Sequence, residues 1–153
     1  MTPDEARRRF AAARVARLAT AGTDGVPHLV PVVFAVDGHT VYSAVDHKPK
    51  RTAALRRLAN VAANPAVALL VDHYDDDWTR LWWVRADGAG RVLSAGSADV
   101  DRAIRLLCDR YPQYAARPPA GPVLAVDVVR WSGWAASDGP VGQPETTTPA
   151  RSS

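Results

Sequence analysis

Three cations in the segment DHKPKRT, namely Lys48, Lys50 and Arg51, are the side chains whose types and spacing point most directly to chemistry. A helix is expected to begin at the end of this segment. A helix N-terminus carries partial positive charge, so it disfavours cations unless an anion binds there. No acidic residue lies between Asp46 and Asp72 to neutralise them. Lysine and arginine beside a helix N-terminus form a common phosphate site, and we predict one here. The alternative is a solvated charged loop.

Other polar side chains give less specific signals. His28 lies on an apolar segment and is a candidate for contact with a substrate, whereas His47 and His73 fit structural hydrogen bonds better than acid–base catalysis. The three aspartates at 75–77 lack the ligand spacing of calcium loops, so no metal site is expected. The sequence has no recognisable catalytic triad or carboxylate pair, and the catalytic residues stay unknown. Such a pattern fits an enzyme whose cofactor carries the chemistry.

Composition limits the class of protein. The 153 residues fit one domain, and 47% hydrophobic with 23% charged residues is ordinary for a globular protein. The net charge of +3 is modest and its cations are local, which argues against a nucleic-acid partner. The single cysteine, Cys108, excludes an internal disulfide, and no apolar run is long enough to span a membrane. We expect a cytoplasmic protein with a folded domain over residues 1–138 and a disordered tail over 139–153.

Hydrophobic periodicity predicts the elements that position these groups. Strands are expected at 15–19, 28–36, 40–45, 66–71, 80–87 with a continuation over 91–94, and 123–134, and helices at 2–13, 52–62 and 97–111. Pro31 cannot donate a hydrogen bond to a sheet, so its strand is expected at an edge or a bulge. Short connections favour antiparallel hairpins. The predicted fold is therefore mainly β with helices (α+β), a six-stranded antiparallel β-barrel with about three flanking helices.

The tryptophans predict a second kind of surface. Trp82 and Trp83 are adjacent in a predicted strand, so their side chains point to opposite faces. One is expected in the core and the other at an interface, where aromatic residues are enriched. Trp131 and Trp134 are expected to pack inside the fold. This pattern favours a dimer.

The order of these motifs resembles the split β-barrel flavoproteins of the pyridoxamine 5′-phosphate oxidase-like superfamily, and within it the actinobacterial branch that binds the deazaflavin coenzyme F420. The similarity covers about residues 4 to 135. It rests on ARLAT at 16–20 with DGVPH at 24–28, DHKPKR at 46–51 with LRRL at 55–58 and NP at 64–65, DHYDDDW at 72–78 with LWWV at 81–84, and RWSGW at 130–134.

The resemblance implies an FMN-binding type of split barrel and a homodimer with the flavin or deazaflavin between its subunits. The three cations would meet the coenzyme's phosphate, the second strand would lie along the ring, and an aromatic residue would reach the site of the partner subunit. The cofactor-binding residues that it implies are Val30, Pro31, Val32, Lys48, Lys50, Arg51 and Trp78.

One departure from the family narrows the expected function. The vitamin B6 oxidases proper end with an Arg-Leu-x-Pro signature that binds the substrate's phosphate, whereas this fold ends with RWSGW, which argues against pyridoxamine phosphate as substrate. We expect an F420-dependent oxidoreductase that transfers a hydride between coenzyme F420 and a small organic substrate. Alternatives are an FMN-dependent oxidase or reductase of the same fold, and a non-catalytic coenzyme- or tetrapyrrole-binding protein. Residue chemistry does not separate F420 from FMN, since both carry a phosphate and a tricyclic ring.

Overall fold

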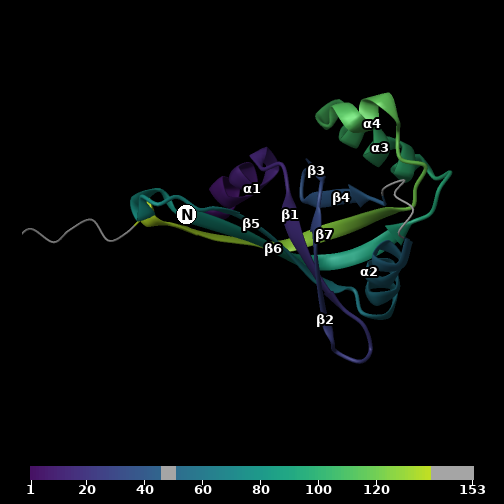
Figure 1. Ribbon diagram of the computed structural model, residues 1–153, viewed down its shortest axis with the longest axis horizontal. Helices are drawn as coiled ribbons and strands as arrows, with labels where there is room; N and C mark the ends of the chain where they lie inside the picture. The colour runs from purple at the N-terminus through teal and green to yellow at the C-terminus, as the bar shows by residue number, and fades with distance from the viewer. Residues whose placement is uncertain (46–50, 139–153) are drawn as a thin grey trace, which may run out of the picture.

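The computed structural model describes residues 1–45 and 51–138, with side chains from residue 56 onward in the second range. Its main element is one antiparallel sheet, drawn as arrows in Figure 1, with the strand order β2-β1-β5-β6-β7-β4-β3. The strands are β1 (Ala16–Ala21), β2 (Pro27–Val32), β3 (Ala35–Asp37), β4 (Thr40–Ala44), β5 (Ala66–His73), β6 (Trp82–Leu93) and β7 (Val123–Ala135). The described fold is therefore mainly β, as predicted, with seven strands instead of six.

The seventh strand arises from a bend in a segment predicted to be one strand, 28–36. Strands β2 and β3 are separated only by Val33 and Phe34, yet they form the two opposite edges of the sheet. Three Cα–Cα steps span at most about 11 Å, so the sheet must curl until its edges almost meet. The result is a barrel that is split between β2 and β3. This bend could not be read from β-branched residues alone, because they favour strand on both sides of it.

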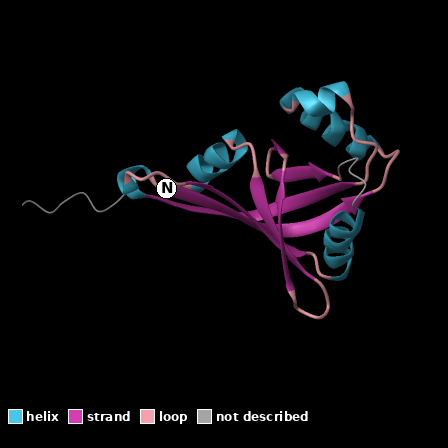
Figure 2. Ribbon diagram, viewed as in Figure 1, coloured by secondary structure: helices cyan, strands magenta, loops and turns pink. Residues whose placement is uncertain are grey.

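Helices cover the outside of the curled sheet, as the cyan ribbons in Figure 2 show. Helix α1 (Pro3–Ala12) is capped by Thr2, and α3 (Ala98–Arg110) by Ser97, each side chain accepting from a backbone N–H three residues on. Helix α2 (Arg51–Ala63) begins within one residue of its predicted start. A short helix that the sequence did not predict, α4 (Pro112–Ala116), follows α3 directly. None of the described helices is long and apolar enough to cross a membrane.

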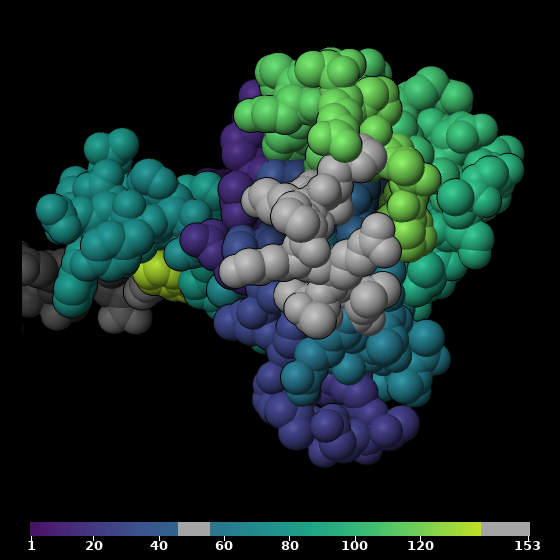
Figure 3. All heavy atoms as spheres, turned by 45° about the vertical axis from the view of Figure 1, so that its right-hand side comes forward, coloured from purple at the N-terminus to yellow at the C-terminus, as the bar shows by residue number. Residues whose placement is uncertain are grey.

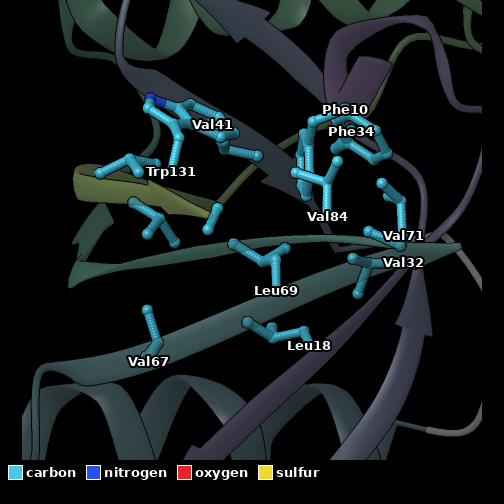
Figure 4. Close-up of a cluster of buried hydrophobic side chains, with 14 of the residues drawn as sticks. Phe10, Leu18, Val32, Phe34, Val41, Val67, Leu69, Val71, Val84 and Trp131 are labelled. Atoms are coloured by element: carbon cyan, nitrogen blue, oxygen red, sulfur yellow. The ribbon is translucent and has the colours of Figure 1, made fainter. Parts of the chain in front are cut away.

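Two packed groups of side chains hold these layers together. The first fills the barrel and includes Phe10, Leu18 and Leu69, whose convergence Figure 4 shows. The second lies between α3 and the strands β3, β4 and β7, and includes Leu107 and Tyr111. Burying a large apolar side chain contributes about 1.5–3 kcal/mol. The two groups therefore fix α1 against β6 and β7, and α3 against β3, β4 and β7.

The end of the β5–β6 hairpin extends from the barrel as an arm, defined here as residues 72–83 with residues 133–138. It contains the 3₁₀ helices η1 (Trp78–Arg80) and η2 (Ala136–Asp138), and Figure 3 shows it projecting from the body of the molecule. Strand β6 reaches this length because it continues through Gly88-Ala89-Gly90, where the sequence predicted an interruption. A bulge between Asp87 and Gly88 absorbs the irregularity.

Candidate functional site

Strand β2 carries three of the predicted cofactor-binding residues along an open edge of the sheet. Val32 is buried in the barrel, Val30 is half-buried against it, and Pro31 faces outward. Pro31 is paired with Arg17 of β1 and has no strand on its other side. The prediction that Pro31 marks an edge is confirmed. An edge strand leaves backbone N–H and C=O groups unpaired, so this segment can accept the polar rim of a ligand.

His28 lies on the same strand and on the same side as Val30 and Val32. Its ring is half-buried, and its Nδ1 is enclosed without a hydrogen-bond partner among the described residues. The residue opposite it is Thr20, whose hydroxyl accepts a 3.1 Å hydrogen bond from Asn60 of α2. His28 therefore stands near the junction of β2 with α2. Its contact with a substrate stays a prediction.

Ser43 on β4 is a polar residue that the sequence reasoning missed. It is 5% exposed, and its Oγ is enclosed with no partner in the described chain. Tyr42 and Ala44 face the second core, so the alternation of the strand directs Ser43 into the barrel together with Val41. A buried hydroxyl without a partner costs free energy and calls for an explanation. A serine within VYSAV resembles any half-buried strand residue, so only its position in the fold identifies it.

The predicted basic segment follows β4 directly. Lys48 and Lys50 lie outside the described residues, as does the side chain of Arg51. The backbone confirms that a helix begins at Arg51, and its first turn contains no acidic residue. Strand β4, with Ser43 one residue before its end, therefore leads into the cations and then into the N-terminus of α2. The phosphate contact itself remains a prediction from sequence.

Trp78 lies at the tip of the arm, where its side chain is 69% exposed. Figure 1 places this tip at one end of the long axis and β2 near the middle, so Trp78 and Val30 to Val32 are not brought together within one chain. Side chains at the tip bind to one another. Asp77 accepts hydrogen bonds from the hydroxyl and the N–H of Thr79, which lower the pKa of its carboxyl group. Asp75 pairs with Arg80 at 3.3 Å, so these carboxylates already have partners in the loop.

A hollow of 770 Å³ lies on the outer face of the sheet, between the arm and the β1–β2 hairpin. Its apolar wall includes Leu29, Leu70, Trp83 and Trp134, each between 37% and 67% exposed. Arg17 also lines it and is neutralised by Asp72 at 3.3 Å. Contiguous apolar surface of this kind marks a site for a ligand or a partner.

Trp82 and Trp83 point to opposite faces of the sheet, as predicted, whereas only one of Trp131 and Trp134 packs inside the fold. Trp82 packs against the first core, and Trp83 lies outward on the wall of the hollow. Trp131 is buried, with its indole N–H donated to Nδ1 of His39 over 3.0 Å. Trp134, expected inside, is 46% exposed and lines the hollow. Trp131 and Trp134 lie three residues apart in a continuously paired part of β7, so the alternation of the strand directs their side chains to opposite faces.

Comparison with known proteins identifies the fold. A family model described as pyridoxamine 5′-phosphate oxidase matches residues 2–135. No curated protein matches the sequence.

Several solved structures share this architecture at low sequence identity. A conserved hypothetical protein from Mycobacterium tuberculosis has a TM-score of 0.69 and 20% identity, over 98% of this chain and 93% of that one. A protein from Vibrio cholerae described as the haem storage protein HutZ has a TM-score of 0.67 and 13% identity, over 88% and 95%. An FAD-binding protein from Mesorhizobium loti has a TM-score of 0.64 and 21% identity, over 87% and 94%. At these identities the likeness extends to the fold alone.

Proposed function

This chain belongs to the pyridoxamine 5′-phosphate oxidase family, and on that premise we propose that it binds a phosphate-bearing flavin-type coenzyme and acts as an oxidoreductase. The coenzyme of choice is F420, and the substrate is a small electron-poor organic molecule such as a conjugated carbonyl compound. When bound in its reduced form, F420 supplies a hydride from its ring C5. Its use here rests on the sequence resemblance described above.

The observation that carries this proposal is the enclosed Oγ of Ser43. It lies 5% exposed near the end of β4, without a hydrogen-bond partner among the described residues, in the strand that leads into Lys48, Lys50 and Arg51. A phosphate held by the cations and the N-terminus of α2 would accept the hydrogen bond that this hydroxyl lacks. The donor set of one hydroxyl, three cations and free helix N–H groups fits a phosphate.

The open edge of β2 would hold the ring. Its unpaired backbone groups at Val30 to Val32 are able to hydrogen-bond the polar rim of a tricyclic ring, and Pro31 presents a flat apolar surface beside them. His28, two residues earlier on the same side as Val30, is the candidate for substrate contact. The proton that must accompany the hydride comes from solvent or from a basic side chain near the ring.

A homodimer completes the proposed site. The apolar wall of the hollow lies open on the sheet, and the exposed Trp78 lies at the tip of the arm. A second copy packed on this face would bury Trp83 and Trp134, and would bring its own Trp78 toward the coenzyme bound at β2 of the first. We therefore place the coenzyme at the interface between subunits, where Trp78 of the partner subunit walls the pocket.

Two alternatives keep the same fold. FMN presents the same phosphate and a similar ring, so the donor set described above would hold it equally well. A non-catalytic tetrapyrrole-binding role has one observation in its favour: His73, an imidazole able to ligate iron, lines the apolar hollow. Its Nε2 lies 3.7 Å from Asp75.

The phosphate site is tested with the double variant Lys50→Ala/Arg51→Ala. Charge-assisted hydrogen bonds contribute about 1.5–3 kcal/mol each, so losing both should raise the Kd for the coenzyme at least a hundredfold. Arg56→Ala, an exposed cation further along α2, is the control for net charge and should change the Kd little. Equal affinity of the double variant and the wild-type protein would refute the phosphate site.

The reaction is tested separately by mixing wild-type protein with reduced F420 and a cyclic enone. Catalysis predicts oxidation of the coenzyme with matching loss of the enone. Binding without turnover across a panel of activated carbonyl compounds would favour the non-catalytic alternative.

A further inference from the structure

The split in the barrel is closed by a side chain from outside the sheet. Phe34 lies in the bend between the two edge strands β2 and β3, where no neighbouring strand is available to pair with its backbone. Its N–H donates to the hydroxyl of Tyr111 over 3.1 Å, and the same hydroxyl lies 2.8 Å from its carbonyl oxygen. Buried backbone groups must find partners. At this bend the Tyr111 hydroxyl replaces the missing strand.

The hydroxyl also joins the start of β1 to the bend. Tyr111 is 8% exposed at the end of α3, and its oxygen lies 3.0 Å from the carbonyl oxygen of Arg14. The Tyr111 hydroxyl has one proton, which the carbonyl oxygens of Arg14 and Phe34 share, and its oxygen accepts the N–H of Phe34. Strands β1 and β2 pair with each other at this edge of the sheet. The hydrogen bonds of Tyr111 therefore link Arg14, just before β1, to Phe34, just after β2.

The side chain of Phe34 is held as firmly as its backbone. It is fully buried, with its ring centroid 4.8 Å from that of Phe10. The guanidinium of Arg110 lies 4.9 Å from the ring centroid on another side and donates to the carbonyl oxygen of Ala13. Cation–π contacts of this kind gain strength when they are removed from water. Two consecutive residues therefore hold the bend: Arg110, the last residue of α3, and Tyr111, which follows it.

Phe34 lies between the two parts of the chain that would bind the coenzyme. On one side of Phe34 lies β2 with Val30 to Val32, which would hold the ring. On the other side, β3 leads through the tight turn at Gly38 into β4 with Ser43, which would meet the phosphate. A coenzyme that contacts one strand through its ring and the other through its phosphate binds best over a limited range of distances between them. That distance depends on the angle of the bend.

We propose that Tyr111 is a positioning residue for the coenzyme, whose hydroxyl fixes the bend at Phe34 and so sets β2 at the correct distance from β4. The inference rests on the proposed function for the identity of the coenzyme. Tyr111 itself touches neither the ring nor the phosphate in this account. Its effect is transmitted through the backbone of Phe34.

The test compares Tyr111→Phe with two controls. Tyr42→Phe removes the hydroxyl of another tyrosine of the second core, also 8% exposed, which forms no hydrogen bond with the described residues. Leu107 of α3 is fully buried in the same core. Leu107→Ala therefore creates a cavity there while the Tyr111 hydroxyl is kept. Each protein is titrated with F420 and with FMN, the visible circular dichroism of the bound coenzyme is recorded, and amide hydrogen exchange is followed over residues 28–36.

The proposal predicts that Tyr111→Phe raises the Kd roughly tenfold, because the released bend weakens coenzyme binding by about the free energy of one hydrogen bond, and alters the circular dichroism of the bound coenzyme. Exchange at residues 28–36 should accelerate. Leu107→Ala should lose more thermal stability than Tyr111→Phe and yet keep its Kd and spectrum, and Tyr42→Phe should match the wild-type protein. A merely structural role would instead make Kd follow stability across the variants.

Two other results would overturn the proposal, and they can be told apart. Wild-type affinity and spectrum in Tyr111→Phe would refute positioning by the hydroxyl and leave the proposed function intact. Failure of the wild-type protein to bind either coenzyme would refute the proposed function, and this inference with it.

Discussion

Arg91 of β6 donates from Nε to Oδ2 of Asp127 on β7 over 2.8 Å, with a second contact of 3.4 Å from its Nη2 to Oδ1. The two strands are thereby joined at the end of the barrel opposite the arm. The hydroxyl of Thr40 on β4 donates to the same carboxylate over 3.1 Å. The hydrogen bonds from Arg91 are the main cause that lowers the pKa of Asp127, and the one from Thr40 adds to the effect. One carboxylate therefore links three strands.

This pair predicts a dependence of stability on pH. Because the pKa of Asp127 is lower in the folded protein, its stabilising effect is complete above the unfolded value of about 3.9 and is lost as the pH falls through the folded value. Both side chains are nearly half exposed, so the pair contributes at most about 1 kcal/mol. Asp127→Asn should be less stable than the wild-type protein at pH 7, and the difference should shrink as the pH falls below the unfolded value. Urea unfolding at pH 7 and through the acid range measures it, and a difference that does not shrink in acid would contradict the assignment.

Ser43 offers a prediction in which stability and binding move apart. Ser43→Ala removes a buried hydroxyl that has no partner in the described part of the chain, so the free energy of unfolding without coenzyme should stay the same or rise by up to about 1 kcal/mol. The Kd for the coenzyme should rise roughly tenfold, because the phosphate loses a donor. Ser132→Ala is a matched control, since its Oγ on β7 is also enclosed and has no partner within residues 1–45 and 56–138. Destabilisation of the coenzyme-free protein by Ser43→Ala would show that the hydroxyl has another role.

The outer face of the sheet predicts an oligomeric state. Trp83→Glu and Trp134→Glu each place a charge on the apolar wall of the hollow, and burying an unpaired charge is strongly unfavourable. Each variant should sediment as a folded monomer at concentrations where the wild-type protein is a dimer. Val92→Glu, a 37% exposed position on β6 outside the hollow, should remain dimeric. A wild-type monomer at micromolar concentration would refute the shared site.

Two glycines of β6 predict different costs for the same substitution. A Cβ at Gly88 would lie 2.4 Å from the backbone carbonyl oxygen of Asp127, whereas one at Gly90 would meet a methyl group of Val61 at 2.8 Å. The backbone of a paired strand cannot move as readily as a side chain, so Gly88→Ala should cost about 3 kcal/mol and Gly90→Ala about 1 kcal/mol. Chemical denaturation measures both. Similar costs would mean that the bulge at Asp87 relaxes easily.

The features that could be predicted from sequence are those with a local signature. Thr2 and Ser97 cap helices because a hydroxyl beside a helix start satisfies a free N–H group, and Pro31 marks an edge because it has no N–H to donate. The split at Phe34 has no such signature. It depends on Tyr111, which lies 77 residues further along the chain and whose hydroxyl replaces a strand only once α3 has packed.

The same distinction applies to the candidate site. The cations Lys48, Lys50 and Arg51 stand out because their charges conflict with a local helix terminus. Ser43 does not, since its significance is the absence of a partner after folding. Trp134 was misplaced for a different reason: it follows the buried Trp131 by three residues in β7, and strand alternation directs two such side chains to opposite faces.

The most direct test of the account is a parallel fluorescence titration of the purified protein with F420, FMN and haem. Saturable binding of F420 with micromolar or lower Kd, and weaker binding of FMN and haem, is the predicted result. Preference for FMN would keep the phosphate site and replace the coenzyme. Binding of haem alone, or of none of the three, would contradict the central claim that this barrel holds a phosphate-bearing flavin-type coenzyme.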